Sequence, residues 1–117
     1  MEKAILKKGD AVLIPDVDIT TGFLERFRGL MFTQSIPDSY GLLIQPCNQI
    51  HMMNMKFPLD VIYLSEEDTV LHIDENIQPW KIGKTVKHAK GVVEVNAGTC
   101  ARLGLETGDR LTIEKNA

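Results

Sequence analysis

The apolar residues of this chain occur in short runs that often alternate with polar residues, and clusters of glycine, proline and aspartate separate these runs. Alternation with period two is typical of strands that bury one face, and turn residues bound such strands. The pattern predicts a mainly β fold: a compact β-sandwich or partly open barrel with two short helices. The predicted strands cover residues 3–7, 11–14, 41–45, 49–53, 59–64, 69–74, 91–95 and 110–114.

The first predicted helix follows Thr20 and Thr21, which are favourable N-cap residues. Helical spacing places Phe23, Phe27 and Leu30 on one face. We therefore expect this helix to cover the β core through that apolar face.

The second predicted helix lies in the segment NAGTCARLG, residues 96–104. Asn96 can cap its start, and Gly104 can adopt the left-handed conformation that ends many helices. Free backbone N–H groups near residues 97–99 would favour an anion, because a helix N-terminus carries partial positive charge.

Length and composition are those of one globular domain, covering residues 1–117. The net charge of −3 gives no overall attraction to nucleic acid or anionic lipid, so we expect neither a nucleic acid nor a membrane as a partner. Charges interrupt residues 1–15, where a signal segment would be apolar, and we expect a cytoplasmic protein. Cys47 and Cys100 are too few for a disulfide framework or a zinc ribbon, and we expect free thiols.

Asp60 is the position that most needs a physical explanation. It shares one face of its predicted strand with Ile62 and Leu64, and the other face is also apolar. A carboxylate there needs a cation or several N–H donors. It is either a structural acid that caps a turn or pairs with an arginine, or a general base or ligand anchor in a cleft. Its possible partners are Arg26, Arg28, His51 and Lys56.

His51 and its neighbours permit two further readings. Cys47, His51 and the methionines at positions 52, 53 and 55 are soft ligands that could hold Cu(I), but their spacing matches no established metal signature. We expect the methionines to fill the core and predict neither a metal nor a cofactor. Cys47, His51 and Asp60 could also act as nucleophile, base and orienting acid, although no nucleophile elbow or glycine-rich loop frames Cys47.

A basic segment follows the predicted strand at 69–74. Residues 76–93 contain no acid, and residues 75–90 show neither helical nor strand periodicity, which predicts a long connection. Spaced lysines beside an indole could hold a phosphate, a carboxylate or a single-stranded nucleic acid, and a solvated loop is the ordinary alternative. The residues concerned are Trp80, Lys81, Lys84, Lys87, His88 and Lys90.

Several segments together resemble one family, domain of unknown function 192, over roughly residues 21–114. They are RFRGLM at 26–31, GLLI at 41–44, Cys47 followed by IHMMNMKFPLD at 50–60, PWK at 79–81, VVEVNAG at 92–98, and the Gly108–Asp109 pair. Met52 departs from the pattern, since a threonine precedes the Met-Arg-Phe-Pro motif in the similar branch. The resemblance implies a β-sandwich or barrel-like fold with short helices, and it implies no activity.

These observations favour a small non-enzymatic binding or accessory domain that recognises an anionic small molecule or an acidic partner surface. The expected ligand-binding residues are Arg28, Asp60, Trp80, Lys81 and Lys84. One alternative is an enzyme with a cleft centred on Asp60, in which Asp60 and His51 are the candidate catalytic residues. Another is a structural protein-interaction module.

Overall fold

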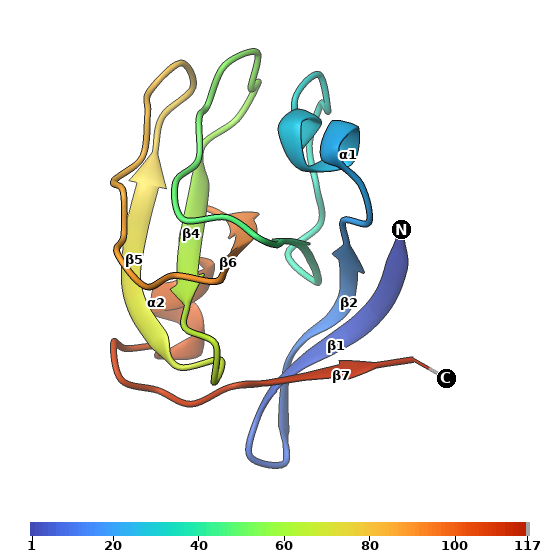
Figure 1. Cartoon of the computed structure of the whole chain (residues 1–117), viewed down its shortest axis with the longest axis vertical. Coiled ribbons are helices and arrows are strands. Elements are labelled where there is room, and N and C mark those ends of the chain that lie inside the picture. The colour runs from blue at the N-terminus through green and yellow to red at the C-terminus, as the bar shows by residue number, and fades with distance from the viewer. Residues whose placement is uncertain (117) are drawn as a thin grey trace.

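Seven strands form one sheet in the computed structural model, which describes residues 1–116, and two short helices flank it (Figure 1). The strands follow one another in the sheet in the order β5-β4-β6-β3-β2-β1-β7. This arrangement confirms the predicted mainly β fold. The elements are β1 (Glu2–Lys8), β2 (Ala11–Ile19), α1 (Phe23–Arg28), β3 (Tyr40–Ile44), β4 (Leu59–Leu64), β5 (Val70–Ile77), β6 (Gly91–Asn96), α2 (Thr99–Leu103) and β7 (Thr112–Lys115).

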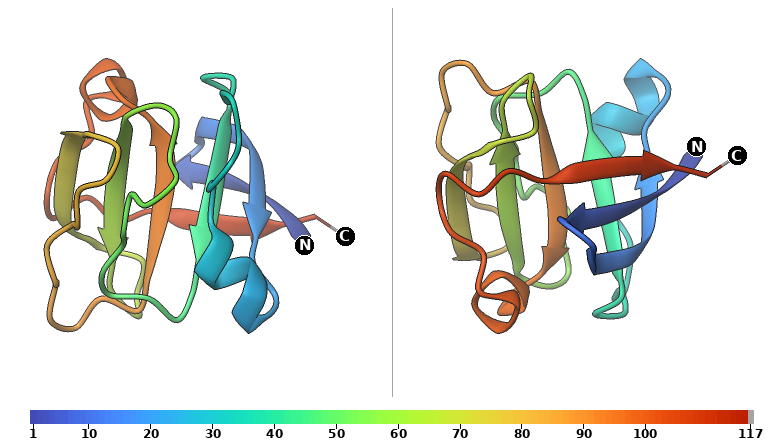
Figure 2. Two further views of the ribbon diagram at one scale, coloured as in Figure 1. Left: turned by 90° about the horizontal axis from the view of Figure 1, so that it is seen from above. Right: turned by 90° about the horizontal axis from the view of Figure 1, so that it is seen from below.

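Strand pairing curls the sheet toward closure. β2 and β3 run parallel, and the other neighbouring strands are antiparallel. The C-terminal segment crosses from the β5 side to β1, where β7 pairs (Figure 2). On the way, Val70 N–H donates to the Asp109 carbonyl at 2.8 Å, and Leu111 N–H donates to that of Asp68 at 2.9 Å. The two edges of the sheet are therefore tied together, and the fold is a partly open barrel.

The central strands are buried on both faces. All six residues of β4 are buried, with Ile62 and Leu64 in the core between the curled strands. Val61 and Tyr63 face a second core, which the loops at 45–57 and 78–90 cover. The alternating register of β4 therefore serves two hydrophobic cores at once.

The predicted strand at 49–53 does not form. His51 makes only an isolated bridge to Ile82, and the surrounding loop packs against the second core. Met52 and Met55 are buried there, as the core-filling interpretation predicts, whereas Met53 is exposed. The alternation of apolar residues here thus comes from a loop whose side chains point alternately into the second core and into solvent, and not from a strand.

Helix α1 does not cover the core through the predicted apolar face. Phe23 and Phe27 are 69% and 52% exposed, and no residue of α1 is buried. The helix ends at Gly29 after six residues, so Leu30 enters the second core from the turn that follows. Gly22, rather than a threonine, is its N-cap residue.

Helix α2 ends as predicted but begins differently. Gly104 adopts the left-handed conformation at its C-terminus, with φ of 67°. Asn96 does not cap the helix, because its amide donates to the Ile36 carbonyl at 2.7 Å and to Asp38 Oδ1 at 2.9 Å. Neither helix has the length or the apolar run that crossing a bilayer requires.

β2 continues past its predicted end at residue 14. Pro15 lies where the β1–β2 register shifts, between the pairs Leu6–Ile14 and Ala4–Val17. A bulge tolerates proline because it demands no ladder N–H at that residue. The strand therefore extends to Ile19.

Candidate functional site

Asp60 is fully buried and bonded to backbone amides. Its Oδ1 accepts the Asn76 N–H at 2.8 Å, and its Oδ2 accepts those of Gly98 and Cys100, both at 3.0 Å. Asn76 lies in a β5 bulge opposite Asp60 and has a positive φ of 53°. The carboxylate thereby fixes both the bulge and the start of α2. This is the geometry of the structural alternative, a turn-capping acid.

The possible triad of Cys47, His51 and Asp60 does not assemble. Asp60 follows the alternation of Ile62 and Leu64 on one face of β4, whereas Cys47 packs against the second core on the opposite face. Cys47 and Cys100 are both free thiols. The N–H groups at the start of α2 are not free for an anion either, since Asp60 occupies those of Gly98 and Cys100.

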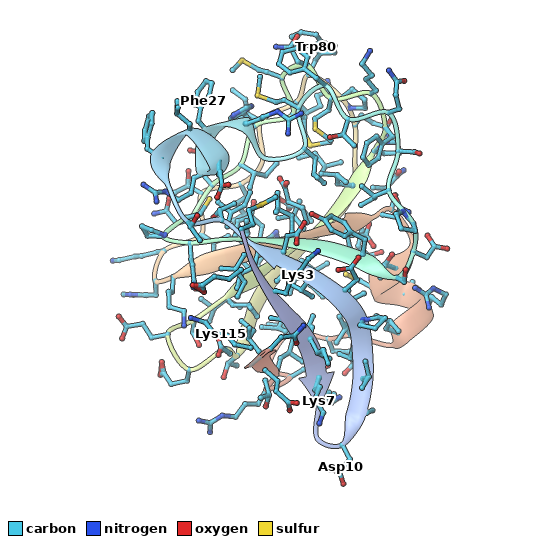
Figure 3. The ribbon with its side chains drawn as sticks, turned by 90° about the vertical axis from the view of Figure 1, so that its right-hand side faces the viewer. Lys3, Lys7, Asp10, Phe27, Trp80 and Lys115 are labelled. Atoms are coloured by element: carbon cyan, nitrogen blue, oxygen red, sulfur yellow. The ribbon has the colours of Figure 1, made fainter. Side chains whose placement is uncertain are left out.

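Exposed apolar side chains gather at one end of the molecule, which we term the apolar end. Figure 3 shows Phe27 and Trp80 at this end and Asp10 at the opposite one. The exposed fractions are 69% for Phe23, 78% for Leu24, 52% for Phe27, 57% for Phe32, 41% for Met53, 64% for Trp80 and 70% for Ile82.

Direct contacts join the segments that form the apolar end. The rings of Phe27 and His51 lie 5.4 Å apart, and His51 forms the bridge to Ile82. Trp80 N–H donates to the Met52 carbonyl at 2.8 Å, and Phe32 N–H donates to the Asn54 carbonyl at 3.1 Å. The exposed side chains therefore lie on α1 and on loops that are hydrogen-bonded to it and to one another.

Two aromatic residues of the apolar end have strained backbones. Phe32 and Trp80 have φ of 66° and 71°, in the left-handed region that bulky side chains rarely adopt. Such conformations persist only where surrounding structure enforces them, and they concentrate at functional sites. Here they hold large apolar groups in solvent.

Positive charge borders the apolar end. The three segments that build it, residues 23–37, 40–59 and 76–93, contain seven of the 13 Lys and Arg residues and a single acid, Glu25. Three of the predicted ligand-binding residues lie exposed in these segments: Arg28 at the end of α1, and Trp80 and Lys81 in a loop.

The other basic residues of the segment differ in their contacts. The backbone N–H of Lys84 donates to Asp74 Oδ2 at 3.3 Å, and its side chain is exposed. Lys87 and His88 are also exposed, on the connection between β5 and β6. Lys90 Nζ instead pairs with Asp68 Oδ1 at 3.3 Å.

A cavity of about 40 Å³ lies beneath the turn that ends α1. Glu94, on β6, is 4% exposed, and its Oε1 has no hydrogen-bond partner among the described residues. A Cβ atom on Gly29 would lie 3.3 Å from that oxygen, so the turn closes directly over it. Burial raises the pKa of Glu94 to about 8. Glu94 is therefore largely protonated at neutral pH.

His51 also lines this cavity. Its Nε2 lies 3.2 Å from the Phe27 carbonyl oxygen. That oxygen can only accept, so Nε2 carries the hydrogen and Nδ1 of the neutral ring presents a lone pair. Nδ1 is buried and has no partner among residues 1–116.

The cavity adjoins an open recess of about 330 Å³. Arg26, Cys47 and His51 line both spaces, and Phe23 and Pro46 line only the recess. Cys47 Sγ donates to the Gln49 carbonyl at 3.1 Å, and burial raises the pKa of this thiol. Cys47 thus remains a protonated thiol, which is a poor nucleophile.

Glu94 was missed in the sequence, although a signal was present. In the strand GVVEVN it alternates with Val93 and Val95 and shares a face with Val92. An acid inside an apolar strand is the same pattern that singled out Asp60. The acid-free segment considered in the sequence, residues 76–93, ends one residue before Glu94.

A family model described as "Uncharacterized ACR", domain of unknown function 192, matches residues 4–113. A UPF0127 protein of Pyrococcus furiosus is 30% identical over 109 residues, which cover 89% of this chain and 90% of that protein. A UPF0127 protein of Pyrococcus abyssi is 32% identical over 100 residues, covering 81% and 83%.

Two crystal structures share the fold. One, from Sinorhizobium meliloti, is provisionally named a transcription regulator; it has a TM-score of 0.81 and 28% identity, and the match covers 96% of this chain and 92% of that one. The other, a protein of unknown function from Novosphingobium aromaticivorans, has a TM-score of 0.78 and 24% identity, covering 94% and 83%.

Proposed function

This chain belongs to the family of domain of unknown function 192, whose description assigns no activity, and we propose that it is a non-enzymatic accessory domain whose apolar end binds an acidic surface of a partner protein. The observation that carries the proposal is the set of large exposed apolar side chains on α1 and on the loops that hydrogen-bond to it and to one another. Contiguous exposed apolar surface is characteristic of interaction sites.

Burial of these side chains would supply the affinity. Transfer of a phenylalanine or leucine side chain out of water contributes about 1.5 to 3 kcal/mol. Trp80, at 64% exposure, is the kind of residue that dominates interface energetics when a partner covers it. The backbone at Phe32 and Trp80 is held in one conformation before binding, so less conformational entropy is lost when a partner binds.

Charge determines which partner fits. Arg26, Arg28, Lys56 and Lys81 come from the segments that build the apolar end, in which Glu25 is the single acid. A partner with carboxylates around an apolar centre would complement this rim and would be steered toward it. We place this activity in the cytoplasm, a compartment that the two free thiols support.

A model peptide tests the proposal. A fluorescein-labelled amphipathic helix of leucine and glutamate should bind the protein, and a leucine and lysine helix with the same apolar pattern should not. Fluorescence anisotropy measures both affinities. Trp80→Ala should weaken binding by roughly tenfold or more, as expected for an interface anchor.

Matched variants separate the apolar end from other exposed positions. Val12 is 52% exposed near the β1–β2 turn, so Val12→Ser should leave the affinity unchanged. Lys81→Glu should weaken binding, and Arg110→Glu, at an exposed position next to β7, should not. The proposal would be contradicted if Val12→Ser weakened binding as much as Trp80→Ala, or if Arg110→Glu weakened it as much as Lys81→Glu. Preferential binding to anionic phospholipid vesicles over the acidic peptide would also contradict it.

A further inference from the structure

The cavity beneath α1 contains two polar atoms that lack a donor. Glu94 Oε1 and His51 Nδ1 are both buried, and neither has a hydrogen-bond partner among residues 1–116. Unpaired buried polar atoms cost about 1 to 3 kcal/mol each, so they are rare in folded proteins. When Glu94 is ionised, both atoms are acceptors. In that state, no described residue donates a hydrogen bond to either atom.

The missing group should also carry positive charge. No ion pair of the described residues includes Glu94, although Arg26 and Arg28 line the same cavity. A compact ammonium group can donate to both a carboxylate and an imidazole lone pair. A cavity of about 40 Å³ accommodates a group of that size, because one water needs about 10 to 15 Å³.

The recess next to the cavity offers the complementary features. Arg26 is positioned to bind a carboxylate, since it lines both spaces. Phe23 and Pro46 provide an apolar wall. A volume of about 330 Å³ lies within the range of small-molecule sites.

We propose that the cavity and the recess together bind a zwitterionic α-amino acid with an apolar side chain. Its ammonium lies between Glu94 and His51, its carboxylate contacts Arg26, and its side chain packs against Phe23. This site shares Phe23 and Arg26 with the surface proposed to bind a partner protein. Glu94 belongs only to the amino acid site, and Trp80 only to the partner surface, so variants of these two residues test the proposals separately.

The ammonium would change the ionisation of Glu94. A neighbouring positive charge lowers the pKa of a carboxyl group, so the ligand should lower the pKa of Glu94 from its raised value of about 8. Affinity should consequently rise as the pH increases toward 8, and fall again where the ligand ammonium deprotonates. The charged and titratable groups around Glu94 are Arg26 and Arg28 from α1, Cys47 and His51 from the loop, Tyr40 from β3 and Tyr63 from β4.

Isothermal titration calorimetry of the full chain with L-leucine tests the site. N-acetyl-L-leucine lacks the ammonium, and L-leucinamide lacks the carboxylate. We expect each derivative to bind at least roughly tenfold more weakly than L-leucine, as for loss of a charge-assisted hydrogen bond. Undetectable binding of L-leucine, or N-acetyl-L-leucine binding as tightly, would overturn the proposal.

Two variants locate the site without relying on one side chain. Glu94→Gln should abolish the pH dependence and weaken L-leucine binding by roughly tenfold or more. Arg26→Gln, on the surface of α1, should weaken L-leucine but not L-leucinamide. Arg102→Gln, on the surface of α2, is the control and should change neither. Unchanged L-leucine affinity in folded Glu94→Gln, or equal losses of leucine and leucinamide in Arg26→Gln, would contradict the assigned geometry.

Discussion

Asp60 and Glu94 are two buried acids with opposite surroundings. Asp60 accepts three backbone N–H groups at 2.8 to 3.0 Å, so its negative charge is solvated by the protein. Glu94 has an oxygen with no partner among the described residues and faces a cavity. The same sequence pattern, an acid on an apolar strand, thus marks a structural residue in one strand and an incomplete polar site in the other.

Replacing Asp60 with asparagine should destabilise the protein. Asparagine has no charge, and its NH₂ group would face an N–H that Asp60 now accepts. We expect Asp60→Asn to lower the free energy of unfolding by about 2 to 4 kcal/mol in urea denaturation. Asp10→Asn, at the exposed β1–β2 turn, should change it by less than about 0.5 kcal/mol. A stable Asp60→Asn variant would refute the structural role.

Glu94 should make the protein less stable as the pH rises. The pKa of Glu94 is raised from 4.5 to about 8 on folding, so between these values the unfolded chain binds fewer protons. The contribution of Glu94 to the free energy of unfolding is therefore fully present below pH 4.5 and is lost as the pH rises to about 8. The loss is at most about 4 kcal/mol.

Urea unfolding of wild type and Glu94→Gln across this pH range measures the effect. The free energy of unfolding of the variant should exceed that of wild type at pH 8, and the difference should shrink toward pH 5. Glu67→Gln, at an exposed position, should leave the pH profile unchanged. Parallel profiles for wild type and Glu94→Gln would mean that Glu94 ionises normally.

At the level of elements, alternation predicted all seven strands of residues 1–116, six of them to within about three residues at each end and β2 five residues too short. It failed at 49–53, because Met52 and Met55 enter the second core from a loop. It also failed for α1, because the spacing of Phe23, Phe27 and Leu30 resembles a buried helical face, whereas the helix ends at Gly29. A single sequence cannot distinguish a helix face that packs on the protein's own core from an exposed apolar face that binds another molecule.

For the site too, the sequence predicted the features that depend on local composition and missed those that depend on long-range contacts. Arg28, Trp80 and Lys81 were expected from local charge and aromatic content, which need no knowledge of the fold. The joining of α1 to the loops at Met53 and Trp80 depends on long-range contacts: Phe27 of α1 contacts His51, and Trp80 hydrogen-bonds to Met52. No local pattern encodes that proximity.

The loop at 78–90 depends on Gly83. A Cβ atom there would lie 2.9 Å from the Tyr63 hydroxyl oxygen and 3.2 Å from Asp74 Oδ2, two atoms that hydrogen-bond at 3.0 Å. Gly83→Ala should therefore lower the free energy of unfolding by about 1 to 3 kcal/mol. Gly22→Ala, which meets no atom within 4 Å, is the control for chemical unfolding. Equal stability of both variants would show that the loop does not pack on Tyr63.

Charge is unevenly distributed over the whole molecule. The chain has a net charge of −3, yet the segments that form the apolar end, residues 23–37, 40–59 and 76–93, contain one acid, Glu25, and seven Lys and Arg residues. The overall charge therefore conceals a basic, apolar end on an acidic protein. Such an end should attract an acidic partner most strongly at low salt, because screening weakens exposed charges.

The fluorescence of Trp80 tests the central claim most directly, since it is the single tryptophan of the chain and lies in the apolar end at 64% exposure. Titration with the unlabelled leucine and glutamate helix should shift its emission to the blue as the indole leaves water. The shift should persist, with weaker affinity, at higher salt. A peptide that binds by calorimetry without changing Trp80 emission would place the interface elsewhere and contradict the proposed function.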